Sequence, residues 1–381
     1  MVTDLQLKFH MGDGCNPLAT GSEHYVAALQ TKPGELEALG EVSMDTWAKF
    51  TPLIQIVGPK SKAELKNADN ITAWTGKISE AVGSHAIFLD ILRLEASHPV
   101  ITGRGIEIPV LERIYWSARK RNLTFVPVVR VGEVRDEHVQ MVADASDIDG
   151  NGVALRWAIR SLTAPSGISV TNYFSKSLTS LRTDVANADL LIDLSFIEPD
   201  TEIHVEDLEP KISKALQVGE WRNVVLLGTS IPAALSCVKE GTVGEIVRQE
   251  WRIWNELSKA GLKRALSFGD YAIQHPKPPQ EGAGGGPPRA NIRYTAADAT
   301  IVARGRGPVS LEGNEQYVGL CKQIVDRTEF SGSTFSWGDG VIEDCARGRL
   351  SPGSQSMWRG AGTSHHLRFI TDQLELSRVS K

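Results

Sequence analysis

The chain has 381 residues, 41% of them hydrophobic, and a formal net charge of −5 at pH 7. This mild charge argues against a protein whose whole surface binds nucleic acid, although it leaves room for a local basic groove. No apolar run approaches the ~18 residues of a membrane span, and the first residues, MVTDLQLKFH, lack the apolar centre of a signal peptide. We therefore expect a globular cytoplasmic protein with no membrane partner.

The N-terminal segment and the cysteines carry little functional signal. Residues 1–24 contain several glycines, and we expect them to form a flexible arm. Cys15, Cys237, Cys321 and Cys345 form no CxxC pair and no Cys/His cluster with the spacing of a zinc site. We interpret them as reduced thiols of an intracellular protein.

Short apolar runs alternate with amphipathic stretches eight times between Tyr25 and Tyr271. The runs cover residues 25–30, 50–57, 86–92, 124–131, 152–159, 189–197, 223–231 and 264–273. Strict alternation of strand and helix requires parallel pairing, because each strand must cross back over the sheet to restart. Eight such units predict a TIM-like (β/α)8 barrel over residues 25–280, a fold whose chemistry sits where the strands end.

Helical patterns separate most of these runs. Residues 108–122 carry apolar side chains on one face and basic residues near the end, as a helix dipole favours. Residues 244–261 have the clearest helical pattern, with Ile246, Trp251 and Trp254 in one apolar stripe. The two tryptophans could stack on a ligand, but at helical spacing such residues are more often core, and we expect a packing role.

A segment dense in glycine and proline, PKPPQEGAGGGPPR, follows the last apolar run. Such a composition cannot join a packed core, and we interpret residues 281–289 as a linker. No Lys-Ser/Thr pair follows its glycines, as a Walker phosphate loop would require. Within residues 290–381, ANIRYT and ATIVARGRG read as two strands and GNEQYVGLCKQIVDR as a helix, which predicts a C-terminal α+β cap subdomain.

Polar residues lie within or just after each apolar run. A buried polar group destabilises the fold by about 1–3 kcal/mol unless it is paired, so many of them at equivalent places indicate a ligand site at the barrel mouth. The candidates are Lys32, Glu35, Gln55, Asp90, Arg130, Arg156, Asp193, Ser195, Thr229, Ser230, Asp270 and Tyr271.

The charges of this set indicate its chemistry. Arginine's planar fork suits phosphate and carboxylate groups, so cations from three different units predict an anionic ligand such as a phosphate ester. The three aspartates could then bind a divalent metal or act as general acid and base. The alternative is structural, because arginines and aspartates inside a barrel can pair across strands and neutralise one another.

The C-terminal part adds Arg293, Arg359, His365 and His366 in short segments that contain glycine. We expect a lid that brings both arginines and one histidine to the barrel mouth. Adjacent histidines on a strand point to opposite faces, so at most one of them should reach the site. The alternative is a histidine pair that is packed or lies on the surface.

Five stretches together resemble the beta protein family of phages and bacterial genomes. They are YVAALQTKPGELEAL, FGDYAI, IRYT, WGDGVIEDC and WRGAGTSHH, and the resemblance runs from about Tyr25 to the C-terminus. It implies a shared architecture and a phage or mobile-element setting, with phage–host conflict or antiviral defence as the context, but no particular activity. Gln55 stands where relatives are expected to carry an acidic residue, which argues against acid–base chemistry at that position.

Two functional hypotheses follow. In the first, the protein is a hydrolase acting on a phosphate-containing substrate, a nucleotide or nucleic acid, at the barrel mouth. In the second, it is a non-enzymatic binding or adaptor protein that captures a nucleotide or a partner protein. The protonation chemistry separates them: an enzyme needs at least one carboxylate or histidine at the mouth that is free of permanent ion pairing, whereas a binder can pair them all.

Overall fold

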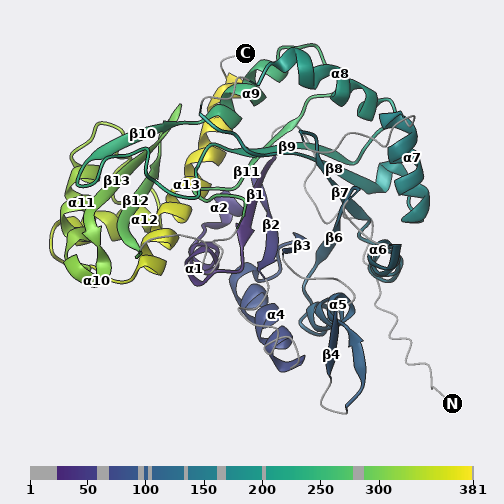
Figure 1. The fold of residues 1–381 in the computed structure, drawn as a ribbon, viewed down its shortest axis with the longest axis horizontal. Helices are drawn as coiled ribbons and strands as arrows, with labels where there is room; N and C mark the ends of the chain where they lie inside the picture. Colours follow the sequence, from purple (N-terminus) through teal and green to yellow (C-terminus); the bar gives the residue numbers. More distant parts are fainter. Residues whose placement is uncertain are drawn as a thin grey trace.

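The computed structural model describes residues 24–57, 68–92, 98–101, 105–132, 136–160, 169–199, 203–277 and 287–379. The predicted N-terminal arm and most of the predicted linker lie outside these residues. The described part consists of a closed barrel and a smaller C-terminal body beside it (Figure 1).

Eight parallel strands close the barrel in the order β1–β11–β9–β8–β7–β6–β3–β2, which confirms the predicted (β/α)8 class. Each of the eight predicted apolar runs contributes one strand. The strands are β1 (Tyr25–Gln30), β2 (Phe50–Val57), β3 (Ile87–Leu92), β6 (Phe125–Arg130), β7 (Val153–Ala158), β8 (Ala188–Phe196), β9 (Asn223–Thr229) and β11 (Ser267–Asp270).

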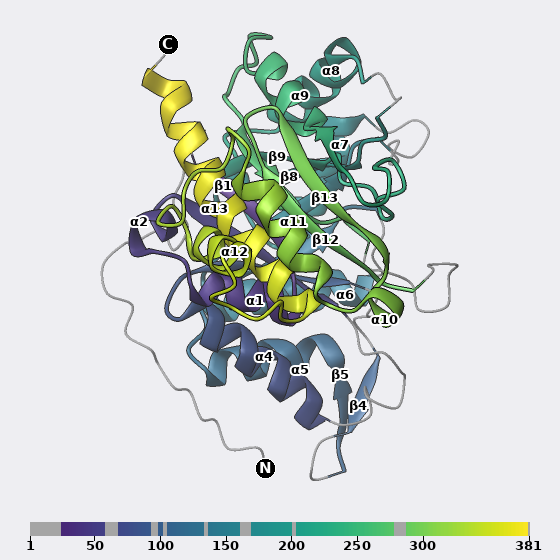
Figure 2. The ribbon, with the colours of Figure 1, turned by 90° about the vertical axis from the view of Figure 1, so that its left-hand side faces the viewer.

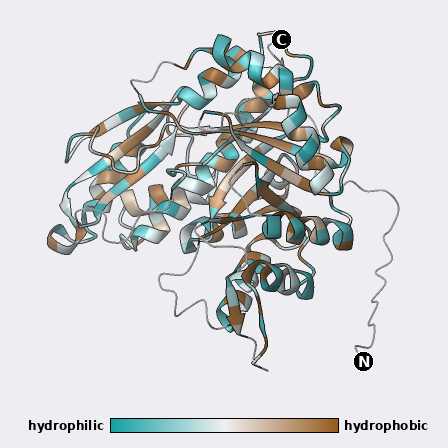
Figure 3. Cartoon of the chain, turned by 45° about the vertical axis from the view of Figure 1, so that its right-hand side comes forward, coloured by the Kyte–Doolittle hydropathy of each residue, from teal (hydrophilic) through white to brown (hydrophobic). Residues whose placement is uncertain are grey.

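Side chains along each strand face alternately into the barrel and out toward the helices. Val26, Leu53, Phe88, Leu191 and Val225 belong to the cluster that fills the interior. The intervening residues pack under the surrounding helices in a larger outer core. The strands are accordingly apolar on both faces, and Figure 3 shows them mostly brown among helices that mix teal and brown residues.

Helices follow the barrel strands as the sequence predicts. They are α1 (Pro33–Gly40), α2 (Met44–Trp47), α4 (Ala68–Val82), α5 (Val110–Lys120), α6 (Asp136–Asp149), α7 (Val170–Ser180), α8 (Val205–Leu216) and α9 (Gln249–Leu257). A hairpin of β4 (Pro99–Ile101) and β5 (Glu107–Pro109) precedes α5, and a 3-10 turn (Val185–Asn187) precedes β8. None of the helices in the described ranges is long and apolar enough to cross a membrane.

The stretch 244–261 is not one helix, as its pattern predicts, but a strand followed by a helix. Residues Val243–Val247 form β10, and Ile246 packs in a small cluster of its own. The helical part, α9, keeps Trp251 and Trp254 at 6% exposure each with their rings stacked, so their role is packing. The apolar spacing fits either structure, and pairing with a strand about fifty residues later decides it.

β10 lies at one edge of a three-stranded antiparallel sheet, β10–β13–β12, in the C-terminal body. The other strands are β12 (Arg289–Thr295) and β13 (Ala299–Pro308), and the helices are α10 (Val309–Glu312), α11 (Gln316–Val325), α12 (Trp337–Ala346) and α13 (Gln355–Val379). We call this body the C-terminal subdomain. Figure 2 shows its sheet and helices in front of the barrel, with α13 beside α1. The C-terminal subdomain therefore includes β10, which lies within residues 25–280, the segment predicted to form the barrel.

α13 belongs to both bodies. Its early residues Trp358 and Ala361 lie in the core of the C-terminal subdomain. Its later residues Leu367, Ile370 and Leu374 lie in the outer core of the barrel, beside β1 and β11. The last helix thus covers the barrel wall where the helix after the eighth strand is expected, and the division predicted at residues 281–289 does not separate two independent cores.

Glycines allow α13 to pack this closely. A Cβ at Gly34 of α1 would overlap the carbonyl oxygen of Ser356, and one at Gly338 of α12 would overlap that of Ala361. A Cβ at Gly362 would lie 2.6 Å from the carbonyl oxygen of Arg293 in β12. The glycines of the KPG, WGDG and GAG segments are therefore packing residues that bring three elements onto α13.

The cysteines within the described residues are free thiols. Cys237 is exposed, whereas Cys321 and Cys345 are buried in the C-terminal subdomain. Cys15 lies outside the described residues.

Candidate functional site at the barrel mouth

Four charged side chains and a tyrosine form a closed network, the mouth network, at the end of the barrel where the strands finish. Arg156 donates to Asp90 at 2.5 Å and to Asp193 at 2.9 Å. Arg130 donates to Asp90 at 3.0 Å. The hydroxyl of Tyr271 donates to Asp193 at 2.7 Å and accepts from Arg156. These residues come from β3, β6, β7, β8 and the residue after β11.

The charges of the mouth network cancel, because two arginines face two aspartates. Burial alone would raise the pKa of Asp90, but Arg130 and Arg156 outweigh it and hold that pKa below its usual value. Burial likewise favours the neutral form of Arg156, yet Tyr271, Asp193 and Asp90 raise its pKa. Arg156 therefore fits the structural alternative, in which arginines and aspartates inside the barrel pair across strands, and it has no free face for an anion. Arg130 is the more exposed of the two, at 26% of its side chain.

Two strand ends adopt left-handed backbone beside this network. Ser195 has a φ of 57° and Ala272 a φ of 48°. In each case the backbone N–H donates to the aspartate two positions earlier, at 2.7 Å to Asp193 and at 2.9 Å to Asp270. Non-glycine residues in this region are unfavourable by about 1–2 kcal/mol. Such strain gathers at functional sites and here fixes the direction of both carboxylates.

Asp270 lies at the same end of the barrel but faces outward, toward α13. It accepts from the Tyr25 hydroxyl at 2.5 Å, and Nε2 of His366 lies 2.9 Å from its other oxygen. Nδ1 of His366 lies 2.7 Å from the Thr295 hydroxyl. Hydroxyl, imidazole and carboxylate follow the order of a nucleophile triad. However, all four residues are at most 2% exposed, so no substrate reaches them, and they fasten α13 to the barrel wall.

His365 is equally enclosed, on the other side of α13. Its Nδ1 lies 3.0 Å from Asp339 and its Nε2 lies 2.9 Å from the carbonyl oxygen of Thr295. The ring stacks on Tyr294 with the centroids 3.7 Å apart. The two histidines lie on a helix and not on a strand. We expected one of them to face the barrel mouth, and neither does. Their contacts are those of packed residues.

A second group of side chains lies where β1 ends and α1 begins. One carboxylate oxygen of the buried Glu35 accepts from the backbone N–H of Gln30 at 2.7 Å, and the other has no hydrogen-bond partner. Burial raises the pKa of Glu35, although Lys32, Arg359 and Arg293 oppose this. A carboxyl group with one unpaired oxygen and a raised pKa is suited to proton exchange.

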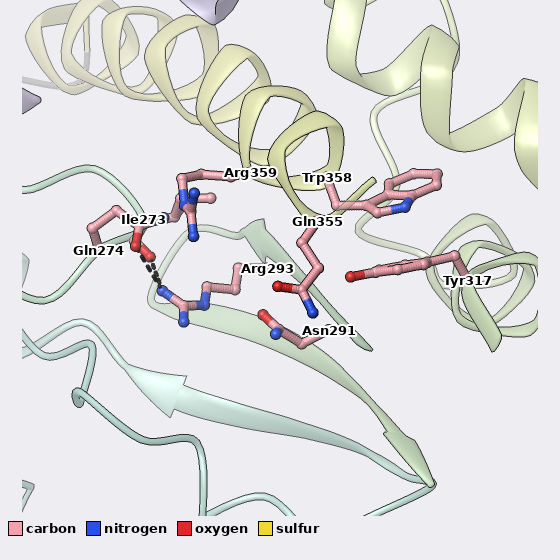
Figure 4. Close-up of a pocket in the computed structure, with 8 residues that line it drawn as sticks. All are labelled: Ile273, Gln274, Asn291, Arg293, Tyr317, Gln355, Trp358 and Arg359. Carbon is pink, nitrogen blue, oxygen red and sulfur yellow. Dashed lines mark hydrogen bonds between the residues drawn. The ribbon is translucent and has the colours of Figure 1, made fainter. Parts of the chain in front are cut away.

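A small polar pocket opens between the loop after β11, strand β12 and the first turns of α13 (Figure 4). Its cavity volume is about 50 Å³, space for a few water molecules. The lining residues are Ile273, Gln274, Asn291, Arg293, Tyr317, Gln355, Trp358 and Arg359. Figure 4 shows the two guanidinium groups on one side of this pocket and the two side-chain amides of Asn291 and Gln355 on the other.

The two arginines of the pocket have no carboxylate within hydrogen-bonding distance among the described residues. Arg293 donates to the carbonyl oxygen of Ile273 and, at 3.4 Å, to Gln274, but its buried Nε has no partner. Burial, together with the positive charge of Arg359, lowers the pKa of Arg293 to about 10, although Glu35 opposes this. Among the described residues, the pocket therefore holds two positive charges with no carboxylate bonded directly to them, and Glu35 interacts with them only through its charge.

Ser230, predicted to bind substrate, has a structural role. Its hydroxyl donates to Glu250 at 2.7 Å and accepts from the backbone N–H of Gln249 at 2.9 Å. It thus satisfies an N–H in the first turn of α9, as a capping side chain does. With a 2% exposure it offers no surface to a ligand.

The predicted site residues therefore fall into separate places. Those at the mouth end of the barrel interior are Asp90, Arg130, Arg156, Asp193 and Tyr271; those near the pocket are Lys32, Glu35, Arg293 and Arg359; those enclosed elsewhere are Ser230, Asp270, His365 and His366. In the described ranges no three His, Cys, Asp or Glu side chains gather where they could hold a metal ion.

Sequence reasoning missed the uncharged residues of the pocket. Asn291, Gln355 and Tyr317 carry no charge and lie in three separate elements. Asn291 stands two residues before Arg293, on the same face of β12, and this spacing is the signal that could have identified it. Nothing in the sequence marks Gln355 or Tyr317.

Comparison with known proteins identifies the family of the chain. A family model described as Beta protein matches residues 25–372, which confirms the resemblance carried by the motifs. Among solved structures, a 3-hexulose-6-phosphate synthase is similar, with 14% identity and a TM-score of 0.32 over 66% of this chain and 91% of that chain. The likeness concerns the fold alone. None of the curated proteins compared with the chain matches it.

Proposed function

The chain belongs to the beta protein family, and from the pocket between its barrel and its C-terminal subdomain we propose that it binds a small phosphate-containing anion. The ligand's phosphate would lie between Arg293 and Arg359. The mouth network has a different role in this proposal, because its arginines are already neutralised; it holds the strand ends in place beside the ligand.

One observation carries the proposal: two arginines share a polar pocket, and no carboxylate of the described residues lies in hydrogen-bonding distance of either. Arg359 lowers the pKa of Arg293, so each positive charge disfavours the other. A dianion between them would remove this repulsion and satisfy the buried Nε of Arg293. Charge-assisted contacts of this kind contribute about 1.5–3 kcal/mol each.

The position of the pocket agrees with the proposal. Ile273 and Gln274 belong to the loop after β11, the eighth strand of the barrel. Barrels of this class frequently bind phosphate at the loops after their seventh and eighth strands. This is an argument by fold analogy and supports the location only, since one fold hosts many chemistries.

Calorimetric titration with inorganic phosphate at constant ionic strength tests the proposal. We expect saturable binding by the wild type and at least a tenfold loss of affinity in Arg359→Ala. Arg306→Ala is the matched control, because Arg306 is an exposed arginine of the neighbouring strand outside the pocket. Equal affinities in all three proteins, or no binding by the wild type, would contradict the proposal.

A second candidate function is hydrolysis of a bound phosphate ester, with Glu35 as the acid because one of its oxygens is unpaired. Glu35 is 0% exposed and lies outside the lining of the pocket, so this function requires the pocket to open onto it when the ester binds. Water would attack phosphorus as the P–O ester bond breaks. The leaving oxygen would take the proton held by Glu35, and the proton released by the water would then restore it. Glu35→Gln should abolish such turnover and keep phosphate affinity within about tenfold, or ~1.4 kcal/mol.

The non-enzymatic alternative, a binding or adaptor protein in phage–host conflict, predicts a different outcome of the same assays. Phosphate esters would bind with the same dependence on Arg359 but would not turn over with any divalent metal present. Capture of a partner protein stays a prediction, as does the phage–host setting that the family resemblance implies.

A further inference from the structure

The pocket is divided into a cationic side and a neutral side, and this division indicates the class of ligand. Resting on the anion site proposed above, we propose that the ligand is a phosphate monoester of a small polyhydroxylated molecule, such as a sugar phosphate. The phosphate would lie at Arg293 and Arg359, and the ligand's hydroxyl groups at Asn291 and Gln355.

The neutral side offers hydrogen-bonding groups that suit hydroxyls. Gln355 is half-buried, at the first residue of α13, and its side-chain amide has no hydrogen-bond partner among the described residues. The Asn291 amide donates to the carbonyl oxygen of Arg289 at 3.1 Å, which leaves its oxygen as an acceptor. Side-chain amides both donate and accept, as hydroxyl groups do.

The aromatic residues of the pocket argue against recognition of a nucleobase. Tyr317 and Trp358 stack on each other with ring centroids 4.9 Å apart and planes 19° apart. Both are buried, and the Trp358 indole donates to the carbonyl oxygen of Pro352 at 2.7 Å. Proteins that bind bases generally present an open aromatic face for stacking. Here the two rings occupy each other's faces, so the pocket offers edges and polar groups instead.

Size and charge point the same way. A cavity volume of about 50 Å³ holds little more than the phosphate group, so the hydroxyl-bearing carbons of a ligand would lie toward the opening of the pocket, and a base with its sugar would lie outside it. Two arginines supply charge for one phosphate group, whereas a nucleic-acid strand needs a longer basic groove along its backbone. The chemistry therefore favours a small monoester over a nucleotide or a polymer.

Titration calorimetry of the full chain with five probes tests this assignment. The probes are inorganic phosphate, glycerol 3-phosphate, ribose 5-phosphate, AMP and a short single-stranded oligonucleotide. We expect ribose 5-phosphate to bind at least tenfold more tightly than inorganic phosphate, and AMP and the oligonucleotide to bind more weakly than ribose 5-phosphate. Equal affinity for phosphate and both polyol phosphates overturns the inference but leaves the anion site intact. Tighter binding of AMP or of the oligonucleotide also overturns it.

Variants on the neutral side make the test specific. Gln355→Ala should remove the preference for ribose 5-phosphate and keep the affinity for inorganic phosphate within about twofold. Gln217→Ala, at an exposed glutamine after α8, is the matched control and should keep the preference. Melting temperatures identify a variant that fails to fold, and Gln355→Ala, which removes no hydrogen bond within the described part of the chain, then decides the outcome. A preference that survives in Gln355→Ala contradicts the inference. Failure of the wild type to bind any probe overturns the anion site as well.

Discussion

At the scale of single residues, some charged side chains at the mouth of the barrel are neutralised by ion pairs, whereas others have no directly bonded partner of opposite charge among the described residues. Arg156 lies between two aspartates and is neutralised by them, whereas Arg293 and Arg359 face a pocket without a carboxylate partner among the described residues. Glu35 is intermediate, with one oxygen bonded and one unpaired. We therefore expect ligand binding to depend on the residues of the pocket, and the stability of the fold to depend on the mouth network.

Substitution of Arg156 should affect folding far more than binding. Arg156→Ala leaves Asp193 without its arginine and Asp90 with Arg130 alone. Breaking a buried ion pair in this way destabilises a protein by about 3–5 kcal/mol. Urea denaturation should show this loss, and a several-fold smaller one for Arg119→Ala, whose partner Asp149 lies nearer the surface. Wild-type stability with lost phosphate binding would assign Arg156 to the ligand instead.

Glu35 should make stability depend on pH. Burial raises its pKa in the folded protein, so folding strengthens proton binding. The resulting stabilisation is fully present below the unfolded pKa of about 4.3 and is lost as pH rises through the folded pKa. The free energy of unfolding of Glu35→Gln should therefore increase relative to that of the wild type between pH 4 and pH 8, because only the wild type loses this stabilisation. Parallel stability curves across this range would show that Glu35 keeps an ordinary pKa.

At the scale of elements, α13 is the part of the molecule on which the site depends. It supplies Arg359 and Gln355 to the pocket, and it packs against α1, α12 and β12 through glycines. Its direction fixes the distance between the arginines and the loop after β11. Small shifts of this helix should therefore alter ligand affinity as well as stability.

Gly34 provides a test of this packing. Gly34→Ala places a methyl group onto the Ser356 carbonyl oxygen, and overpacking of this kind destabilises by about 1–3 kcal/mol or more. Gly40→Ala, in the same helix with open space around it, should be neutral or stabilising by up to about 1 kcal/mol. Thermal denaturation of both variants measures the difference. Equal melting temperatures would mean that α1 and α13 are not in close contact.

Element prediction from the sequence succeeded where the signal is local. The eight barrel strands follow from alternating apolar runs, which depend on neighbouring residues alone. β10 was missed because the apolar spacing around Ile246 fits a helix, and its partner β13 lies some fifty residues away. The start of α13 was missed because Gly360, Gly362 and two histidines have low helix propensity, and packing against three elements overrides it.

The site was less predictable than the fold for a related reason. Strand formation depends on local sequence, whereas ion pairing between strands depends on how the barrel closes. The sequence places Asp90, Arg156 and Asp193 at strand ends but does not show that they neutralise one another. The same holds for Asp270, whose position in its strand is right but whose side chain faces outward. Alternation along a strand as short as β11 does not fix which face is inside until its neighbours are known.

At the scale of the whole molecule, the barrel and the C-terminal subdomain share one helix and therefore one folding unit. α13 contributes to both cores, and the buried chain of Tyr25, Asp270, His366 and Thr295 crosses between them. Differential scanning calorimetry should accordingly show a single cooperative transition, with calorimetric and van't Hoff enthalpies in agreement. Two resolved transitions would indicate that the two bodies unfold independently.

The central claim is that a phosphate-containing anion binds between Arg293 and Arg359. The most direct measurement is the anomalous difference density of a crystal soaked in tungstate, a heavy tetrahedral dianion that imitates phosphate. The account predicts a peak within the pocket formed by the loop after β11, β12 and the start of α13, and no such peak in Arg359→Ala. A peak inside the barrel at Arg130, or none near either arginine of the pocket, would contradict it.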